Sequence, residues 1–321
     1  MTTRPKLLIT RRLPDAVTKR VEAHYEVELN ADDHVMSADE LLSKALGKDA
    51  LLVTPVDKIT PELVEKLPTS IKMIATFSVG YEHINVPALK ARGIKASNTP
   101  DVLTDATADI ALLLLLGAAR RAYEGERAVR DGTWKSWSTV YMLGVHATGK
   151  RLGIFGMGRI GQAVAKRARA FDMTIHYYNR SRLAPELELG AIYHKTAEDM
   201  LPHCDFLSIN APGGAETQHW LNAQRIALMP DGAIVVNTAR GGLVDDAALI
   251  AALKSGKLFA AGLDVFENEP NLNPAYRNLS NVFLLPHLGS ATIDTRNAMG
   301  FKALDNLDAF FAGRPLIDPI A

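Results

Sequence analysis

A run of glycines at fixed spacing is the clearest chemical signal in the 321-residue chain. Gly156, Gly158 and Gly161 form the pattern G-x-G-x-x-G between an apolar, strand-like run and a helix-like segment. Gly156 permits a tight turn, Gly158 lets the backbone approach a pyrophosphate, and Gly161 lets helix and strand pack closely. Free N–H groups at the start of such a helix face the phosphates. The pattern therefore predicts a dinucleotide site, which also includes Arg159 and Ile160.

The segment after the next strand-like run bears on which dinucleotide binds. It reads Asn179, Arg180, Ser181 and Arg182. A site for NAD usually places Asp or Glu here to bind the ribose 2′-hydroxyl. This segment has no acid, and its two arginines can bind a 2′-phosphate bidentately. We expect NADPH as the cofactor, with NADH bound more weakly; a solvated loop that merely carries two arginines is the alternative.

Arg240, Glu269 and His287 follow three later strand-like runs in the same part of the chain. The carboxyl ends of parallel strands share one edge of a sheet, and ligands bind there in open α/β sheets. The three side chains are therefore candidates for a single site. Taken singly, each has an ordinary explanation, as a surface charge, a turn residue and a loop histidine.

The order and spacing of these segments resemble the D-isomer-specific 2-hydroxyacid dehydrogenase family over nearly the whole chain. Residues 235–242, 261–270 and 285–292 carry the likeness together with the glycine pattern. Residues 100–109 and 289–292 are most similar to the glyoxylate/hydroxypyruvate reductase branch of that family. The resemblance implies reduction of a small 2-oxo acid, either glyoxylate to glycolate or hydroxypyruvate to D-glycerate.

The resemblance also implies a role for each candidate residue. By their match to family positions, His287 donates the proton, Glu269 is its partner and Arg240 clamps the substrate. Imidazole suits proton transfer near neutral pH, a neighbouring carboxylate favours its protonated form, and guanidinium can hold a carboxylate and polarise a ketone. Val79 and Gly80 are implied to bind the substrate beside Arg240 and His287. Further positions implied to line the cofactor are Thr107, Ala211, Pro212, Thr238, Ala239, Asp264, His287 and Gly289. For Asp264, a strand-end cap is an equal alternative.

Two other functions remain open at this point. The first is another activity of the same family, such as a phosphoglycerate, lactate or phosphite dehydrogenase. The second is a dinucleotide-sensing binding protein without turnover, because the family's relatives include transcriptional corepressors. A complete set of arginine, glutamate and histidine favours turnover.

Composition excludes several classes of partner. Thirty-six basic residues balance 36 acidic ones, which leaves no global field for nucleic acid or an anionic membrane. A single cysteine, Cys204, excludes an internal disulfide, and the histidines lack metal-ligand spacing, so we expect no metal. The N-terminus has no secretory apolar core, and the most hydrophobic stretch, 110–119, is about half the roughly 20 residues of a membrane span. We expect a cytoplasmic protein whose partner is a small 2-oxo acid.

The resemblance further implies a homodimer. In relatives, the region around Trp134 and Trp137 packs between subunits, and tryptophans suit a buried interface. Packing within one chain is the alternative.

The elements that must position these residues alternate between β-rich runs and helical segments, which is typical of parallel α/β architecture. Six strand-like runs between residues 151 and 285 suit a dinucleotide-binding sheet. We expect two doubly wound parallel-sheet domains. A Rossmann dinucleotide-binding domain, 101–289, is inserted into a flavodoxin-like substrate-binding domain made of 1–100 and 290–321. One long helix, about 104–130, should carry the chain into the insert, and a terminal helix, about 292–311, should complete the first domain.

Overall fold

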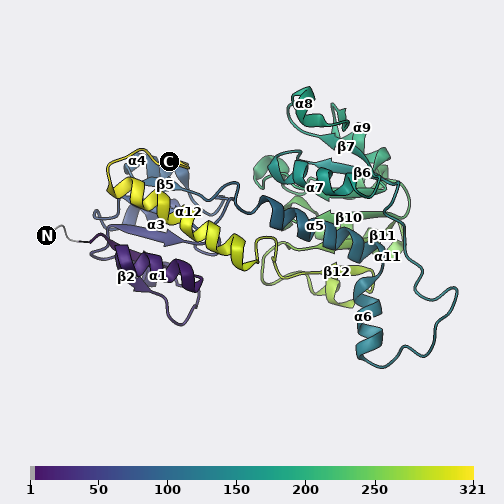
Figure 1. Ribbon diagram of the computed structural model, residues 1–321, viewed down its shortest axis with the longest axis horizontal. Helices are drawn as coiled ribbons and strands as arrows, with labels where there is room; N and C mark the ends of the chain where they lie inside the picture. The colour runs from purple at the N-terminus through teal and green to yellow at the C-terminus, as the bar shows by residue number, and fades with distance from the viewer. Residues whose placement is uncertain (1–3) are drawn as a thin grey trace. The chain divides into compact units, whose positions relative to one another are not determined.

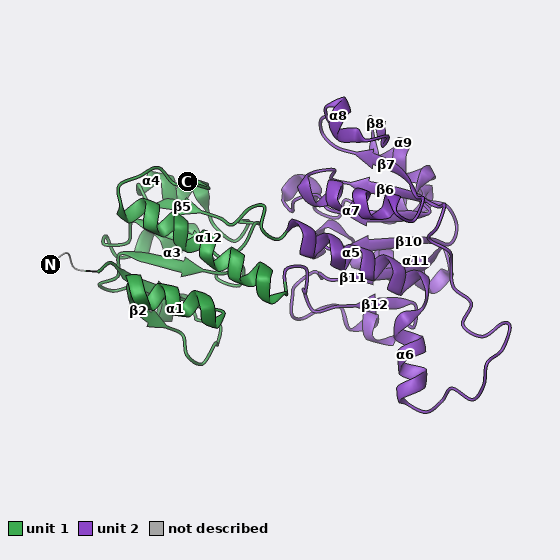
Figure 2. Cartoon of the chain, viewed as in Figure 1, with its two compact units in different colours: residues 1–103, 291–321 green, residues 104–290 purple. Residues whose placement is uncertain are grey.

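The protein, described here as a computed structural model covering residues 4–321, divides into two compact units. Unit 1 consists of the residues up to 103 together with 291–321, and unit 2 consists of 104–290 (Figure 2). Each unit is built around one sheet in which every paired strand is parallel. The chain enters unit 2 once and returns, so unit 2 is an insertion in unit 1.

Unit 1 contains a five-stranded sheet of order β2-β1-β3-β4-β5. Its strands are β1 (Lys6–Ile9), β2 (Glu26–Leu29), β3 (Ala50–Val53), β4 (Met73–Thr76) and β5 (Lys95–Ser97). Its helices are α1 (Asp15–His24), α2 (Ala38–Lys44), α3 (Pro61–Lys66), α4 (Val86–Ala91) and α12 (Ile293–Phe311). The strand order is that of flavodoxin-like folds.

Helices cover both faces of this sheet, because β3 and β4 are buried at every residue and apolar at all but Thr76. One core packs residues of α2, α3 and α4 against the strands, and the other packs residues of α1 and α12. Gly300 of α12 permits a close contact, since a Cβ there would lie 2.4 Å from Val17 Cγ2 in α1. Unit 1 is therefore doubly wound.

Unit 2 contains a seven-stranded sheet of order β12-β11-β10-β9-β6-β7-β8 (Figure 1). Its strands are β6 (Arg151–Phe155), β7 (Thr174–Tyr178), β8 (Ile192–His194), β9 (Phe206–Ile209), β10 (Ala233–Asn237), β11 (Leu258–Leu263) and β12 (Val282–Leu284). Its α-helices are α5 (Thr104–Ala119), α6 (Ala122–Arg130), α7 (Arg159–Arg169), α8 (Pro185–Glu188), α9 (Ala197–Met200), α10 (Ala223–Leu228) and α11 (Asp246–Ser255). Four short 3-10 helices are Leu201–His203, Ala215–Thr217, Gly241–Leu243 and Pro274–Asn278.

The strand order of unit 2 reverses between β6 and β9, which is the topological switch point where dinucleotides bind in Rossmann folds. Buried residues of α5 and α7 form the core on one face of the sheet, and those of α10 and α11 form the core on the other. The Rossmann prediction for this part of the chain is confirmed.

Two details of the predicted fold are wrong. The sheet has a seventh strand, β8, whose three residues pair with the edge strand β7 and form no apolar run that the sequence would reveal. The predicted helix over 104–130 is two helices, α5 and α6. Arg121 separates them with φ +54°, a left-handed conformation that cannot continue a right-handed helix.

The most hydrophobic stretch, 110–119, lies in α5, where most of its side chains are buried. Over residues 4–321, none of the helices combines the length and the apolar character that a membrane crossing requires.

Candidate active site

The glycine pattern forms the turn between β6 and α7. Gly156 has φ +92°, and a Cβ there would lie 2.5 Å from the backbone nitrogen of Ala211. A Cβ on Gly161 would lie 2.3 Å from Gly156 O, so both positions require glycine. Gly158, at the N-cap of α7, has open space where its side chain would stand. An open turn at a helix N-terminus fits a pyrophosphate.

The loop after β7 is joined to this turn by Asn179, whose Oδ1 accepts a hydrogen bond from Met157 N at 2.7 Å. Arg180 and Ser181 are exposed, and neither forms a hydrogen bond or ion pair with any residue that the structure describes. Arg182 differs, because its Nε and Nη2 donate to the two carboxylate oxygens of Glu188 at 2.8 and 2.9 Å. The two predicted phosphate-binding arginines therefore stand in different electrostatic surroundings.

Arg240 lies in the loop after β10. The Asn237 side chain shapes this loop: its Nδ2 donates to Arg240 O at 2.9 Å, and its Oδ1 accepts from Ala239 N at 3.0 Å. The next residue, Gly241, touches the loop after β11, since a Cβ on it would lie 1.8 Å from the carbonyl carbon of Phe266. The missing side chain thus lets the loop that bears Arg240 and the loop that bears Glu269 lie in direct contact.

Glu269 and His287 form a hydrogen-bonded pair. His287 Nδ1 lies 2.8 Å from Glu269 Oε2, and Glu269 Oε1 accepts from Phe266 N at 2.8 Å. Burial acts to raise the pKa of Glu269, but the hydrogen bond and charge of His287, with smaller contributions from Phe266 N–H and Arg240, lower the pKa below its ordinary value. Arg240 therefore acts electrostatically on the same carboxylate that contacts His287.

The backbone of His287 is held in the left-handed region, with φ +56°. Such a conformation is uncommon for a residue other than glycine and persists only where its surroundings impose it. Here His287 N donates to Asp264 O at 2.9 Å. The side chain remains accessible, since 45% of its surface is exposed, compared with 32% for Glu269.

Asp264, at the end of β11, is completely buried and supports the loop that carries His287. Its two carboxylate oxygens accept from Leu288 N at 2.6 Å and Gly289 N at 2.7 Å. Burial raises the pKa of Asp264, although these two N–H groups oppose the shift. Thr107 Oγ1 donates to Gly289 O at 3.2 Å in the same place. This geometry favours the strand-end cap for Asp264.

Two buried polar atoms lie at the carboxyl ends of β9 and β10. Asn210 Oδ1 and Thr238 Oγ1 are buried and have no hydrogen-bond partner among the residues that the structure describes. Ala211 and Pro212 follow Asn210, and Ala239 follows Thr238. Together with the open turn at Gly158, these atoms fit a bound dinucleotide. Asn210 carries no recognisable signal in the sequence.

Val79 and Gly80 lie in unit 1, in the loop after β4. Their carbonyl groups are engaged: Asn98 Nδ2 donates to Val79 O at 2.7 Å, and Ser78 Oγ donates to Gly80 O at 2.7 Å. Within the described residues, no hydrogen-bond acceptor faces the N–H groups of Val79 or Gly80. Such a turn can bind an anion through its backbone.

Three histidines that are distant in the sequence meet at the other edge of the unit 2 sheet. The ring of His176 lies 5.0 Å from that of His203 and 5.2 Å from that of His194, and His176 Nδ1 lies 2.9 Å from His194 Nε2. Burial, together with His194, His203 and Arg151 and against the opposing charge of Asp205, lowers the pKa of His176 to about 4. No group of side chains in the described part of the chain has the arrangement of a metal site.

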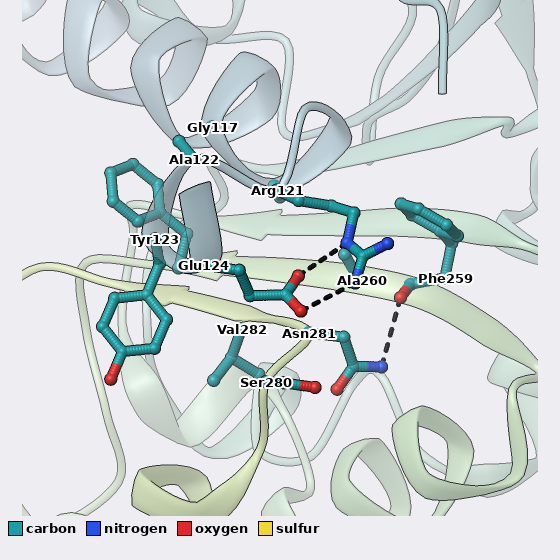
Figure 3. Close-up of a pocket in the computed structure, with 12 residues that line it drawn as sticks. Gly117, Arg121, Ala122, Tyr123, Glu124, Phe259, Ala260, Ser280, Asn281 and Val282 are labelled. Atoms are coloured by element: carbon teal, nitrogen blue, oxygen red, sulfur yellow. Dashed lines mark hydrogen bonds and ion pairs between the residues drawn. The ribbon is translucent and has the colours of Figure 1, made fainter. Parts of the chain in front are cut away.

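A cavity of about 240 Å³ lies away from the predicted site residues. It is bordered by the junction of α5 and α6 and by the starts of β11 and β12, with the ion pair of Arg121 and Glu124 on its wall (Figure 3). None of the predicted catalytic or cofactor residues lines it.

Comparison with known proteins agrees with this fold. Residues 112–289 match the family model described as D-isomer specific 2-hydroxyacid dehydrogenase, NAD binding domain. A glycerate dehydrogenase of Hyphomicrobium methylovorum is 46% identical over 310 residues, covering 96% of each chain. A glyoxylate reductase of Thermococcus litoralis is 45% identical over 97% of this chain and 95% of that protein.

A solved structure also shares the fold of the whole chain. That of an NADPH-dependent glyoxylate/hydroxypyruvate reductase from Sinorhizobium meliloti, in complex with NADP and malonate, aligns with a TM-score of 0.90 at 35% identity. The alignment covers 99% of this chain and 97% of that one. Fold, glycine turn and family model together define an NAD(P)-dependent oxidoreductase. The chain belongs to the D-isomer specific 2-hydroxyacid dehydrogenase family.

Proposed function

We propose that this protein reduces a small 2-oxo acid with NADPH, converting glyoxylate to glycolate and hydroxypyruvate to D-glycerate. The observation that carries the proposal is the contact between Glu269 and His287, with Arg240 acting on the same carboxylate, at the carboxyl edge of a dinucleotide-binding sheet. The names of the relatives from Thermococcus litoralis and Sinorhizobium meliloti support the choice of substrate. The relative from Hyphomicrobium is named for glycerate dehydrogenation, which is the reverse of the second reaction.

In this proposal each side chain has one task. The bound reduced cofactor supplies the hydride to the carbonyl carbon. His287 gives a proton from Nε2 to the carbonyl oxygen, because its Nδ1 faces Glu269. Glu269 fixes the orientation of the ring and stabilises the imidazolium when it is present. Arg240 binds the substrate carboxylate and polarises the carbonyl bond, so hydride and proton together yield the hydroxyl group of the product.

The remaining predicted residues bind or position. Val79 and Gly80 of unit 1 are proposed to bind the substrate carboxylate through their N–H groups. Thr107 and Asp264 hold the loop of His287 through Gly289. The glycine turn, with Arg159 and Ile160 at the start of α7, is proposed to bind the pyrophosphate, and Asn210, Ala211, Pro212, Thr238 and Ala239 to line the cofactor.

Preference for NADPH over NADH is proposed from the loop after β7. Residues 179–182, directly after the strand, include no carboxylate that would repel a 2′-phosphate. Arg180 is exposed and has no hydrogen-bond or ion-pair partner among the described residues. A guanidinium with its donors available can bind a phosphate bidentately.

We also propose a homodimer. The segment after α6 extends from the rest of unit 2 as a long loop (Figure 1), and it exposes large apolar side chains. Trp134 is 51% exposed, Trp137 79% and Val140 73%. Exposed aromatic residues grouped in one segment suit a subunit interface. Light scattering during size-exclusion chromatography tests this, and a monomeric mass at micromolar concentration would contradict it.

The decisive experiment follows the absorbance of the reduced nicotinamide while glyoxylate, hydroxypyruvate, pyruvate and 2-oxobutyrate are added in turn, with NADPH and with NADH. We expect turnover with the first two substrates and a higher kcat/KM with NADPH. His287→Ala should still bind NADPH while its turnover collapses. Binding of NADPH without oxidation by any 2-oxo acid would instead favour a dinucleotide sensor.

A further inference from the structure

Arg182, in the loop after β7, forms an ion pair with Glu188. A role for Arg182 as a phosphate ligand does not explain this pair. Glu188, at the end of α8, has only 9% of its side chain exposed, yet it holds both donors of one edge of the Arg182 guanidinium. Arg182 itself is 62% exposed. A bidentate contact of this kind fixes the orientation of the guanidinium and neutralises its charge locally.

Glu188 is held from two further sides. Tyr177 Oη donates to Glu188 Oε1 at 2.6 Å and accepts from Leu183 N at 3.0 Å, while Arg169 Nη2 donates to Glu188 O at 2.8 Å. The hydrogen bonds from Arg182 and Tyr177 lower the pKa of Glu188 to about 2, so the side chain is a carboxylate at neutral pH. The carboxylate is thus a fixed part of the loop and remains beside Arg182.

The charges of this loop can then be compared. Arg182 and Glu188 cancel each other at short range, whereas Arg180 has no partner among the described residues. Asn179 ties the same loop to the glycine turn through Met157 N, so these charges belong to the part of the site that faces the ribose end of a dinucleotide.

We infer that Glu188 is a specificity-determining residue that limits the preference for NADPH without touching the cofactor, by neutralising Arg182 and leaving Arg180 to provide the net positive charge for the 2′-phosphate. The inference rests on the proposed NADPH site. It assigns different roles to Arg180 and Arg182.

The test measures dissociation constants of NADPH and NADH for the purified enzyme without substrate, by fluorescence titration, and compares their ratio among variants. Glu188→Gln keeps an acceptor for Tyr177 and Arg182 but removes the negative charge, so NADPH should bind about threefold to tenfold more tightly relative to NADH. Arg182→Gln leaves Glu188 unbalanced and should shift the ratio by a similar factor in the opposite direction. The double variant, with a neutral pair, should return within about twofold of the wild-type ratio. All these shifts should shrink at high salt.

Two controls separate charge from structure. Tyr177→Phe removes a hydrogen bond to Glu188 without changing any charge, so it should lower the thermal unfolding temperature and leave the cofactor ratio within about twofold. Arg180→Ala should weaken NADPH binding relative to NADH in every background.

The outcomes are distinguishable. If the double variant binds NADPH as poorly as Arg182→Gln alone, then Arg182 contacts the phosphate directly and the inference is wrong. A Glu188→Gln variant with an unchanged ratio would also overturn it. If Arg180→Ala leaves the ratio unchanged, the proposed 2′-phosphate site is itself wrong, and the inference falls with it.

Discussion

The contact between the loops that bear Arg240 and Glu269 can be tested with one methyl group. In Gly241→Ala, the new Cβ would lie 1.8 Å from the Phe266 carbonyl carbon and 2.0 Å from its oxygen. An ordinary contact begins at about 3.4 Å, so one backbone segment must move by about 1.6 Å. Displacements of about 1 Å in a catalytic group can reduce turnover about a hundredfold. We therefore expect kcat/KM to fall about a hundredfold or more.

Gly242 is the matched control, since it is the next residue in the same loop. A Cβ on Gly242 would lie 2.8 Å from Oε1 of the Gln218 side chain, which can rotate away. Gly242→Ala should therefore keep kcat/KM within about threefold of the wild type. Gly242→Ala should bind NADPH within about twofold of the wild type. Gly241→Ala should still bind NADPH, because the glycine turn after β6 is a separate segment, but more weakly, since Thr238 and Ala239 of the displaced loop are proposed to line the cofactor.

Steady-state kinetics with glyoxylate, cofactor titration and thermal unfolding together separate the explanations. A Gly241→Ala protein that folds, binds NADPH and has lost kcat supports the loop contact as the cause. Near-normal turnover in Gly241→Ala, or an equal loss in Gly242→Ala, would refute the reasoning.

Three further predictions concern single side chains. Glu269→Gln should lower kcat about tenfold to a hundredfold with little change in the dissociation constant of NADPH, and unchanged kcat across the pH range would exclude its proposed role beside His287. Because the pKa of His176 is lowered to about 4 from an ordinary 6.5, the unfolded chain takes up this proton first as the pH falls, so stability is lost between these values. Urea unfolding should detect a loss of about 2 to 3 kcal/mol from this residue between about pH 7.5 and 4.5, and the loss should be smaller in His176→Phe; an identical pH slope in the variant would contradict the assignment. Asp264→Ala leaves the N–H groups of Leu288 and Gly289 unsatisfied and should destabilise the fold by about 2 kcal/mol or more, and a thermal unfolding temperature equal to that of the wild type would argue against the cap.

Much of the fold could be predicted because its signals are local. The spacing of Gly156, Gly158 and Gly161 follows from steric limits within one turn. A side chain on Gly156 would clash with the backbone of Ala211, and one on Gly161 would clash with the carbonyl oxygen of Gly156. The break at Arg121 could not be predicted in this way. Arginine is a good helix former, and no proline or glycine directly follows Arg121, so only the left-handed φ reveals where α5 ends.

The candidate site could be predicted only for residues that directly follow a strand, because the end of the strand fixes where in the sheet they lie. Arg240, Glu269 and His287 could be placed at one sheet edge because each follows a strand of the same parallel sheet. Contacts between side chains of neighbouring loops and helices could not be predicted in this way. Glu188 lies six residues after Arg182, beyond a proline that starts a short helix, and Tyr177 in the strand before also donates a hydrogen bond to it.

Several hydrogen bonds hold the pair of Glu269 and His287, and the loop of Arg240, in place. Asn237 fixes the loop of Arg240, Phe266 N–H fixes one oxygen of Glu269, and Asp264 fixes the backbone around His287. Each support is a hydrogen bond within unit 2, and none of the supporting groups has a proposed role in hydride or proton transfer. Such an arrangement keeps charges and donors oriented in advance, which is the condition under which they stabilise a transition state without reorganising. The left-handed backbone of His287 belongs to the same scheme, since the hydrogen bonds around it offset the strain that the conformation carries.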